Sequence, residues 1–161
     1  MRIALGSDHA GFYLKTNLIE YLESLGHEVS DFGSYDPEPV DFPDISRIVC
    51  QAILHEKADR GILLCGTGIG AAIASNKIPG IRAGVCHDYH SAHQGVEHDN
   101  MNVLCLGAQI VAWWLMRDLV QAFLNAEFST DEDLRRRVRK LDDIEREAIH
   151  MLNGKDGNSP G

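Results

Sequence analysis

Apolar residues follow two different spacings that alternate along the chain. Five short runs are rich in apolar residues, which is typical of strands, and the segments between them repeat apolar residues every three or four positions, which is typical of helices. The expected strands are residues 2–7, 27–33, 60–65, 80–86 and 102–107. The expected helices are residues 10–25, 44–57, 69–77, 88–97, 110–125 and 130–152.

Strands separated by single helices form parallel sheets that carry helices on both faces. We therefore predict a three-layer α/β/α, Rossmann-like fold with a five-stranded parallel sheet in the common order 2-1-3-4-5. The last helical segment has no strand after it and is expected to be an extra C-terminal helix. A chain of 161 residues suits one domain. We place this domain at residues 1–152 and expect the tail, 153–161, to be disordered.

The formal net charge of −9 argues against a nucleic-acid or anionic-membrane partner, because both need a basic surface. It leaves room for a small anionic substrate, which needs only a local cationic pocket. The first residues read as a strand rather than a signal peptide, and no apolar run approaches the roughly 20 residues of a membrane-spanning helix. The four cysteines form no CxxC pair, so we expect reduced thiols in a cytoplasmic protein.

The predicted topology locates a binding site. In open parallel sheets, ligands bind beyond the carboxyl ends of the strands, at the point where the strand order reverses. In the predicted order the first and third strands flank this point. The segment that leaves the first strand, SDHAG, carries Asp8 and His9, and the segment that leaves the third, CGTGIG, carries Cys65 and Thr67. We expect these four residues to lie together.

The CGTGIG segment suits a reaction that develops negative charge. Gly66, Gly68 and Gly70 let backbone N–H groups approach a ligand closely, and a helix that starts there adds unpaired donors and partial positive charge. Such a place stabilises an oxyanion and favours the thiolate of a nearby cysteine, which makes Cys65 a candidate base or nucleophile. The alternative is that this thiol only fills a strand end. The segment matches neither the Walker pattern nor GxGxxG, so a nucleotide site is poorly supported.

A metal site is less favoured than a site for an anion. Cys65, Cys86 and Cys105 each end a strand, so they are expected to lie in a row along the sheet edge, whereas tetrahedral zinc needs converging ligands. A basic cluster, RRRVRK, begins at residue 135 in this acidic chain. Such a run is usually a solvated helix face, but a helical wheel puts Arg137 within about 40° of the mean direction of the apolar residues Leu134, Val138, Leu141 and Ile144. An arginine on a packed helix face needs an anionic partner to offset the loss of solvation, and a phosphate group could be that partner.

Taken together, these motifs resemble the type B ribose-5-phosphate isomerases and the related galactose-6-phosphate isomerase subunits. The matching pieces are GSDHAGFYLK, DFG, DFPD, CGTGIG, NKIPGIRA, EHDNMNVLCLG and RRRV, which extend from residue 2 to about residue 140. The resemblance implies an aldose–ketose isomerase of phosphorylated sugars that works through a cis-enediolate without a metal or cofactor. Ribose 5-phosphate is the substrate that it implies first.

The resemblance also assigns roles to residues. It implies that Cys65 is the base that moves a proton between C1 and C2, and that Thr67 and the amides of residues 66–70 surround the reacting oxygens. Asp8 and His9 match a pair that contacts the sugar hydroxyls and the phosphate end. His98 matches the histidine that the family uses to open the furanose ring, and Asp99 matches the next residue in the substrate site. Arg137 matches a phosphate-binding arginine.

His98 directly precedes the fifth strand, so it should lie at the amino edge of the sheet in its own chain, away from Cys65. Both residues can serve one site only if a neighbouring chain contributes His98. The topology therefore predicts an oligomer, either a homodimer or a dimer of dimers, and the resemblance implies dimers that share sites across the interface.

The chain departs from the family pattern at three places. Asp99 stands where the family commonly has Asn, Phe42 where it commonly has Tyr, and Asp133-Leu134 where it often has Arg-His. A second phosphate arginine is thus missing, and the segment around it is closer to one galactose-6-phosphate isomerase subunit type. Two alternatives stay open: an isomerase of a galactose or tetrose phosphate, or a non-catalytic phosphosugar-binding subunit that needs a partner chain.

Overall fold

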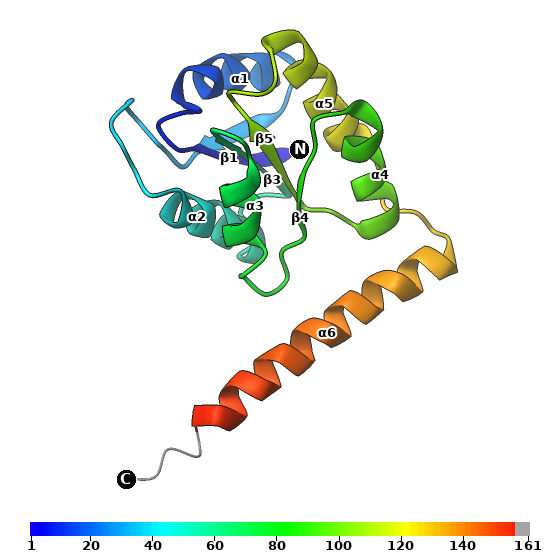
Figure 1. Ribbon diagram of the computed structural model, residues 1–161. Coiled ribbons are helices and arrows are strands. Elements are labelled where there is room, and N and C mark those ends of the chain that lie inside the picture. The colour runs from blue at the N-terminus through cyan, green and yellow to red at the C-terminus, as the bar shows by residue number, and fades with distance from the viewer. Residues whose placement is uncertain (157–161) are drawn as a thin grey trace.

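Parallel strands form one sheet that has helices on both faces (Figure 1). The computed structural model describes residues 1–156, within which the sheet has five strands. These are β1 (Arg2–Ser7), β2 (Glu28–Asp31), β3 (Arg60–Cys65), β4 (Ala83–Val85) and β5 (Val103–Gly107). The helices are α1 (Phe12–Ser24), α2 (Phe42–Leu54), α3 (Ile69–Ser75), α4 (Tyr89–Asp99), α5 (Trp113–Asn125) and α6 (Glu132–Asp156). The predicted fold class is confirmed.

The observed strand order is β2-β1-β3-β5-β4, so the predicted order is wrong for its last two strands. β5 pairs with β3 on one side and with β4 on the other, and all pairs are parallel. Burial explains the exchange. All five residues of β5 are buried, whereas the three residues of β4 are only partly buried. The more apolar strand takes the central place, and β4 forms the edge. β1 and β3 are neighbours in either order.

The sheet separates two apolar cores. On one face, α1, α4 and α5 pack against the strands, and large buried residues such as Leu18 and Phe123 fill the space. On the other face, α2 and α3 cover a smaller core in which Cys65 and Cys105 lie. Successive strand residues point to opposite faces. This alternation fixes which face each residue at a strand end joins.

The last helix, α6, extends away from the rest of the chain (Figure 1). Its 25 residues span about 37 Å. Val138 is buried, whereas several large apolar residues of the helix are exposed, namely Leu141, Ile144, Ile149, Met151 and Leu152. The helix ends at Asp156, four residues later than predicted, so residues 153–156 of the tail that we expected to be disordered are helical. Residues 157–161 of that tail lie outside the described part of the chain. No helix in residues 1–156 has both the length and the apolar character needed to cross a membrane.

A buried lysine ties α1 to the carboxyl ends of the first two strands. Lys15 is 1% exposed, and its ammonium group donates to Asp31 Oδ1 at 2.5 Å and to the Ser34 carbonyl oxygen at 2.6 Å. The loop it holds exchanges two backbone hydrogen bonds with Ser7, the last residue of β1. Lys15 therefore supports the backbone immediately before Asp8.

We expect Lys15→Met to lower the free energy of unfolding by about 2–4 kcal/mol, because it leaves a partly buried carboxylate without its cation and a carbonyl without its charged donor. Urea titration of the variant measures the loss. Lys77→Met, at an exposed position, is the matched control and should stay within about 0.5 kcal/mol of wild type. Equal stability of the two variants would show that the buried ammonium contributes nothing net.

Candidate active site

The ends of β1 and β3 meet as the sequence predicted. The amide of Asp8 donates to the carbonyl oxygen of Leu64, at 3.1 Å. The Asp8 carboxylate is almost fully buried, and its Oδ1 accepts from the amides of Ala10 at 2.9 Å and Gly11 at 3.2 Å. A side chain at Gly11 would lie 2.7 Å from Leu64 Cβ, so only glycine lets α1 start this close to β3. Asp8 is thus fixed beside the end of β3.

The turn after β3 wraps around the thiol of Cys65. Cys65 is 5% exposed, and its Sγ accepts from the amide of Gly68 at 3.0 Å. Gly68 has a φ of +81°, which favours glycine, and a Cβ there would lie 3.1 Å from the Leu106 backbone. The turn is therefore pressed against β5. Thr67 is exposed, and its Oγ1 accepts from the amide of Ile69 at 3.3 Å.

Two backbone donors of this turn are not used by the protein. Within residues 1–156, the amides of Gly66 and Thr67 have no hydrogen-bond acceptor, whereas the next two amides bond Cys65 Sγ and Thr67 Oγ1. Unused amides beside a thiol can bind an oxygen that gains negative charge. Gly70 serves packing, since a Cβ there would lie 3.0 Å from the ring of Phe42, at the start of α2.

The other three cysteines have a different environment. Burial raises the pKa of the Cys50 thiol, raises that of Cys86 to about 11 with a smaller contribution from Asp88, and raises that of Cys105 well above its usual value. These thiols are therefore protonated near neutral pH. Within residues 1–156, Cys65 is the cysteine whose sulfur accepts a backbone N–H. Its surroundings differ from those of a cysteine that only fills a strand end.

The sequence did not point to two side chains at this edge, those of His87 and Gln109. The backbone N–H of Gln109 donates to the carbonyl oxygen of Gly66 at 3.0 Å. The side-chain oxygen of Gln109 would lie 3.3 Å from a Cβ placed at that glycine. His87 Nε2 accepts from the amide of Gly107 at 3.1 Å, so this nitrogen carries no proton. Gln109 borders the Cys65 turn because β5 is the neighbour of β3, whereas the predicted strand order had separated these two strands. His87 follows β4 and reaches the same edge through its contact with Gly107, at the end of β5.

His9 lies at the outer side of the same edge. It is exposed, and its Nδ1 accepts from the amide of Val40 at 3.4 Å, in the loop between β2 and α2. This contact turns the imidazole toward the loop that leads to Phe42. His9, Asp8 and the Cys65 turn therefore form one cluster at the carboxyl ends of the strands, as predicted.

His98 and Asp99 are not part of this cluster. They occupy the last turn of α4, before the start of β5 at the opposite edge of the sheet. The side chain of His98 is 37% exposed, and its Nε2 lies 3.8 Å from a carboxylate oxygen of Glu97. In one chain, therefore, His98 and Cys65 lie at opposite edges of the sheet.

Arg137 lies on α6, and the prediction that it faces the packed side is wrong for the single chain. It is exposed, while its neighbours Arg136 and Arg139 pair with Asp133 and Glu132. Arg135 packs instead: its guanidinium lies 5.0 Å from the ring centre of Phe128. The helical wheel identified the apolar face correctly, but α6 leaves the domain, so nothing in residues 1–156 covers most of that face.

In the described part of the chain, no group of three or more His, Cys, Asp or Glu side chains is placed to hold a metal ion. What the carboxyl edge holds is one thiol, one fixed carboxylate and two unused amides. This set suits an enzyme that moves a proton on a small molecule while an adjacent oxygen becomes negative.

Comparison with known proteins identifies that enzyme class. The chain belongs to the Ribose/Galactose Isomerase family, whose model matches residues 3–141. It is 43% identical over 131 residues to the D-erythrulose-4-phosphate isomerase of Pectobacterium atrosepticum, covering 80% of this chain and 85% of the relative. It is 32% identical over 158 residues to the galactose-6-phosphate isomerase subunit LacB of Clostridium acetobutylicum, covering 98% and 89%.

A solved structure supports the same assignment. Ribose-5-phosphate isomerase B from Clostridium thermocellum matches with a TM-score of 0.89 and 42% sequence identity, covering 92% of this chain and 99% of that one. The protein is therefore an isomerase of the aldose–ketose class, as the sequence resemblance implied.

Proposed function

We propose that the chain interconverts a phosphorylated aldose and its ketose through a cis-enediolate, with ribose 5-phosphate and ribulose 5-phosphate as the first pair to test. The observation that carries this proposal is the Cys65 thiol, which lies at a strand end beside two amides without acceptors and a fixed carboxylate. Turnover by the purified chain of a panel of tetrose, pentose and hexose phosphates tests it.

The geometry supports a division of the chemistry among a thiol, a pair of amides, a hydroxyl and a carboxylate. The thiolate of Cys65 takes the proton from C2 of the aldose and returns it to C1, and the Gly68 N–H bond stabilises the thiolate meanwhile. The amides of Gly66 and Thr67 bind the oxygen that becomes negative. The hydroxyl of Thr67 accepts the proton of O2 and gives one to O1. Asp8, oriented by two amides, accepts from sugar hydroxyls.

We further propose that the site is completed by a second copy of the chain, which supplies His98 and Arg137. On α6, Arg137 lies about 20° from Ile144 and about 40° from Leu141 around the helix axis, and both apolar residues are exposed. A second copy that covers this face would therefore also cover Arg137. Exposed apolar residues also surround the Cys65 turn and offer a surface for such contact, namely Phe42, Ile69, Ile73 and Ile110.

The size of the sugar is a separate matter, and two features are reasons to test other sugar phosphates beside the pentose. Asp133, in place of a second arginine, lies in the first turn of α6 and pairs with Arg136 at 3.2 Å, so it adds negative charge near the proposed phosphate cation. In addition, relatives named for tetrose and hexose phosphates match the chain over most of its length. If the purified chain binds phosphosugars but isomerises none of them, it would instead be one subunit of an enzyme made of two kinds of chain.

Arg137→Ala should raise the Michaelis constant for phosphorylated substrate by about 10- to 150-fold, because a charge-assisted guanidinium–phosphate contact is lost. Steady-state kinetics measures it. The matched control is Arg136→Ala, which removes an arginine that already pairs with Asp133. Turnover of the unphosphorylated sugar should be the same in both variants. An Arg137→Ala enzyme with an unchanged Michaelis constant would place this arginine on a merely solvated face.

A further inference from the structure

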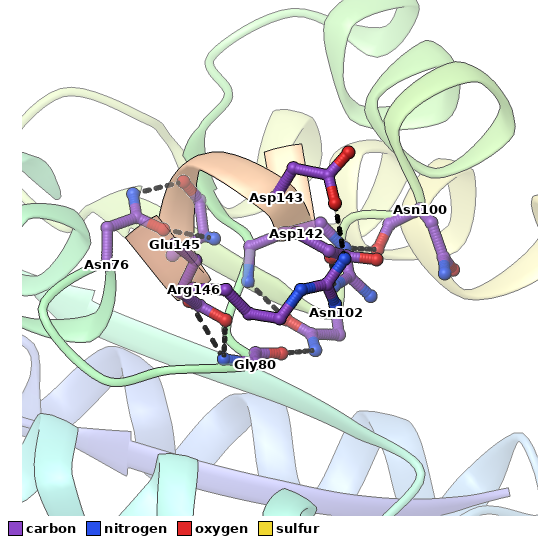
Figure 2. A network of polar contacts seen from close by, with 10 residues as sticks. Asn76, Gly80, Asn100, Asn102, Asp142, Asp143, Glu145 and Arg146 are labelled. Atoms are coloured by element: carbon purple, nitrogen blue, oxygen red, sulfur yellow. Dashed lines mark hydrogen bonds and ion pairs between the residues drawn. The ribbon is translucent and has the colours of Figure 1, made fainter. Parts of the chain in front are cut away.

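A polar network fixes α6 to the loop that leads into β4 (Figure 2). The amide of Gly80 donates to both carboxylate oxygens of Glu145, each at 3.0 Å. Gly80 has a φ of +84°, and a Cβ there would lie 3.0 Å from Leu54. This left-handed glycine turn directs its N–H toward α6. The acceptor is charged, which makes this the stronger kind of hydrogen bond.

The same network reaches the residues next to His98. Arg82 donates through Nε to the carbonyl oxygen of Asn100 at 2.8 Å, and its Nη1 lies 3.8 Å from Asp142 of α6. Asn102 closes the loop, because its side chain donates to the Gly80 carbonyl at 2.9 Å and accepts from the Arg82 amide at 2.8 Å. The end of α4, the 80–82 loop and α6 are thus joined by consecutive polar contacts.

These contacts lie close to two residues of the proposed function. Asn100 follows His98 by two positions. Asp142 and Glu145 follow Arg137 on the same helix by five and eight residues, or about 7.5 and 12 Å along its axis. Between them, Val138 is buried and holds the intervening turn. The direction of α6, and hence the position of Arg137 relative to His98, is therefore set largely by this network.

We propose that Glu145 and Arg82 are positioning residues that hold His98 and Arg137 in a fixed relation, so that one chain presents both to the site of its partner. This inference rests on the proposed function, in which these two residues serve one site. Neither Glu145 nor Arg82 touches the substrate. Glu145 sets the direction of α6, and so affects how Arg137 binds phosphate. Arg82 contacts both α6 and the end of α4, and so affects the distance and angle between Arg137 and His98.

The test compares Glu145→Ala with a matched control, Asp143→Ala. Asp143 is an acid on the same helix, but its carboxylate pairs with the exposed Arg146 (Figure 2). In Glu145→Ala we expect hydrogen exchange at the Gly80 amide to accelerate by about tenfold or more. The dissociation constant of inorganic phosphate and the Michaelis constant should rise by about 5- to 20-fold, since misplacement of a positioning group by about 1 Å is costly. The turnover number should change by less than about twofold, and Glu145→Gln, which keeps an acceptor oxygen, should restore most of the loss.

The Arg137→Ala background separates positioning from general structural damage. If Glu145 acts through Arg137, adding Glu145→Ala to Arg137→Ala should leave phosphate affinity where Arg137→Ala puts it. Additive losses, or a Gly80 amide that exchanges at the wild-type rate in Glu145→Ala, would overturn the inference. So would unchanged phosphate affinity in Glu145→Ala. If wild type binds phosphate but isomerises no sugar of the panel, the proposed function fails, while the phosphate measurements still decide the role of Glu145.

Discussion

Cys65→Ala should lower the turnover number by about 100- to 10,000-fold, the loss that follows removal of a positioned acid or base. The residue is 5% exposed and has a backbone N–H on its sulfur, and alanine keeps Cβ but removes the sulfur that would take the proton. The Gly66 and Thr67 amides remain, so substrate binding should weaken much less than turnover. Steady-state kinetics on the best phosphosugar of the panel measures both parameters.

A second cysteine variant separates loss of chemistry from loss of structure. Cys50→Ala removes a buried thiol from α2, whose pKa burial raises, so it should keep turnover within about threefold of wild type. Both variants should melt within about 5 °C of wild type. If Cys65→Ala retained more than a tenth of the wild-type turnover number, another group would have to be the base.

The central part of the site could be predicted because it depends on few steps of reasoning. Asp8 and Cys65 each follow a strand, and β1 and β3 are neighbours in both the predicted and the observed order. The exchange of the last two strands therefore did not disturb this pair. It did hide Gln109, whose place beside the turn depends on β5 lying next to β3. Local spacing indicates strands well, but strand order depends on competition for the buried centre.

The position of Arg137 shows a second limit of the sequence. Periodicity gives the angle between Arg137 and the apolar residues of α6, and that angle is the same whether or not the helix is covered. Whether the face is buried depends on a surface that the spacing does not describe. Among the described residues of this face, only Val138 is well buried, and the packed arginine is Arg135, through Phe128 of the preceding segment.

Mixing two inactive variants should restore activity if two chains build each site. A Cys65→Ala chain keeps His98, and a His98→Ala chain keeps Cys65. In a mixed two-fold dimer, one site receives both intact residues and the other receives both substitutions. If subunits exchange at random, half of the dimers are mixed and half of their sites are intact, so about a quarter of the wild-type turnover should return. A native gel of differently tagged chains verifies the exchange.

The reverse mixture makes the test decisive. A chain that carries both Cys65→Ala and His98→Ala is mixed with an equal amount of wild type. If sites are shared, every site of a mixed dimer lacks one of the two residues, so turnover should fall from about half to about a quarter of that of pure wild type as subunits exchange. If each chain held a complete site, turnover would stay at about half. The two mixtures thus move in opposite directions under the shared-site proposal, because His98 at the amino edge and Cys65 at the carboxyl edge come together only across an interface. A constant half in this mixture, together with no recovery in the first, would show that the two residues act within one chain.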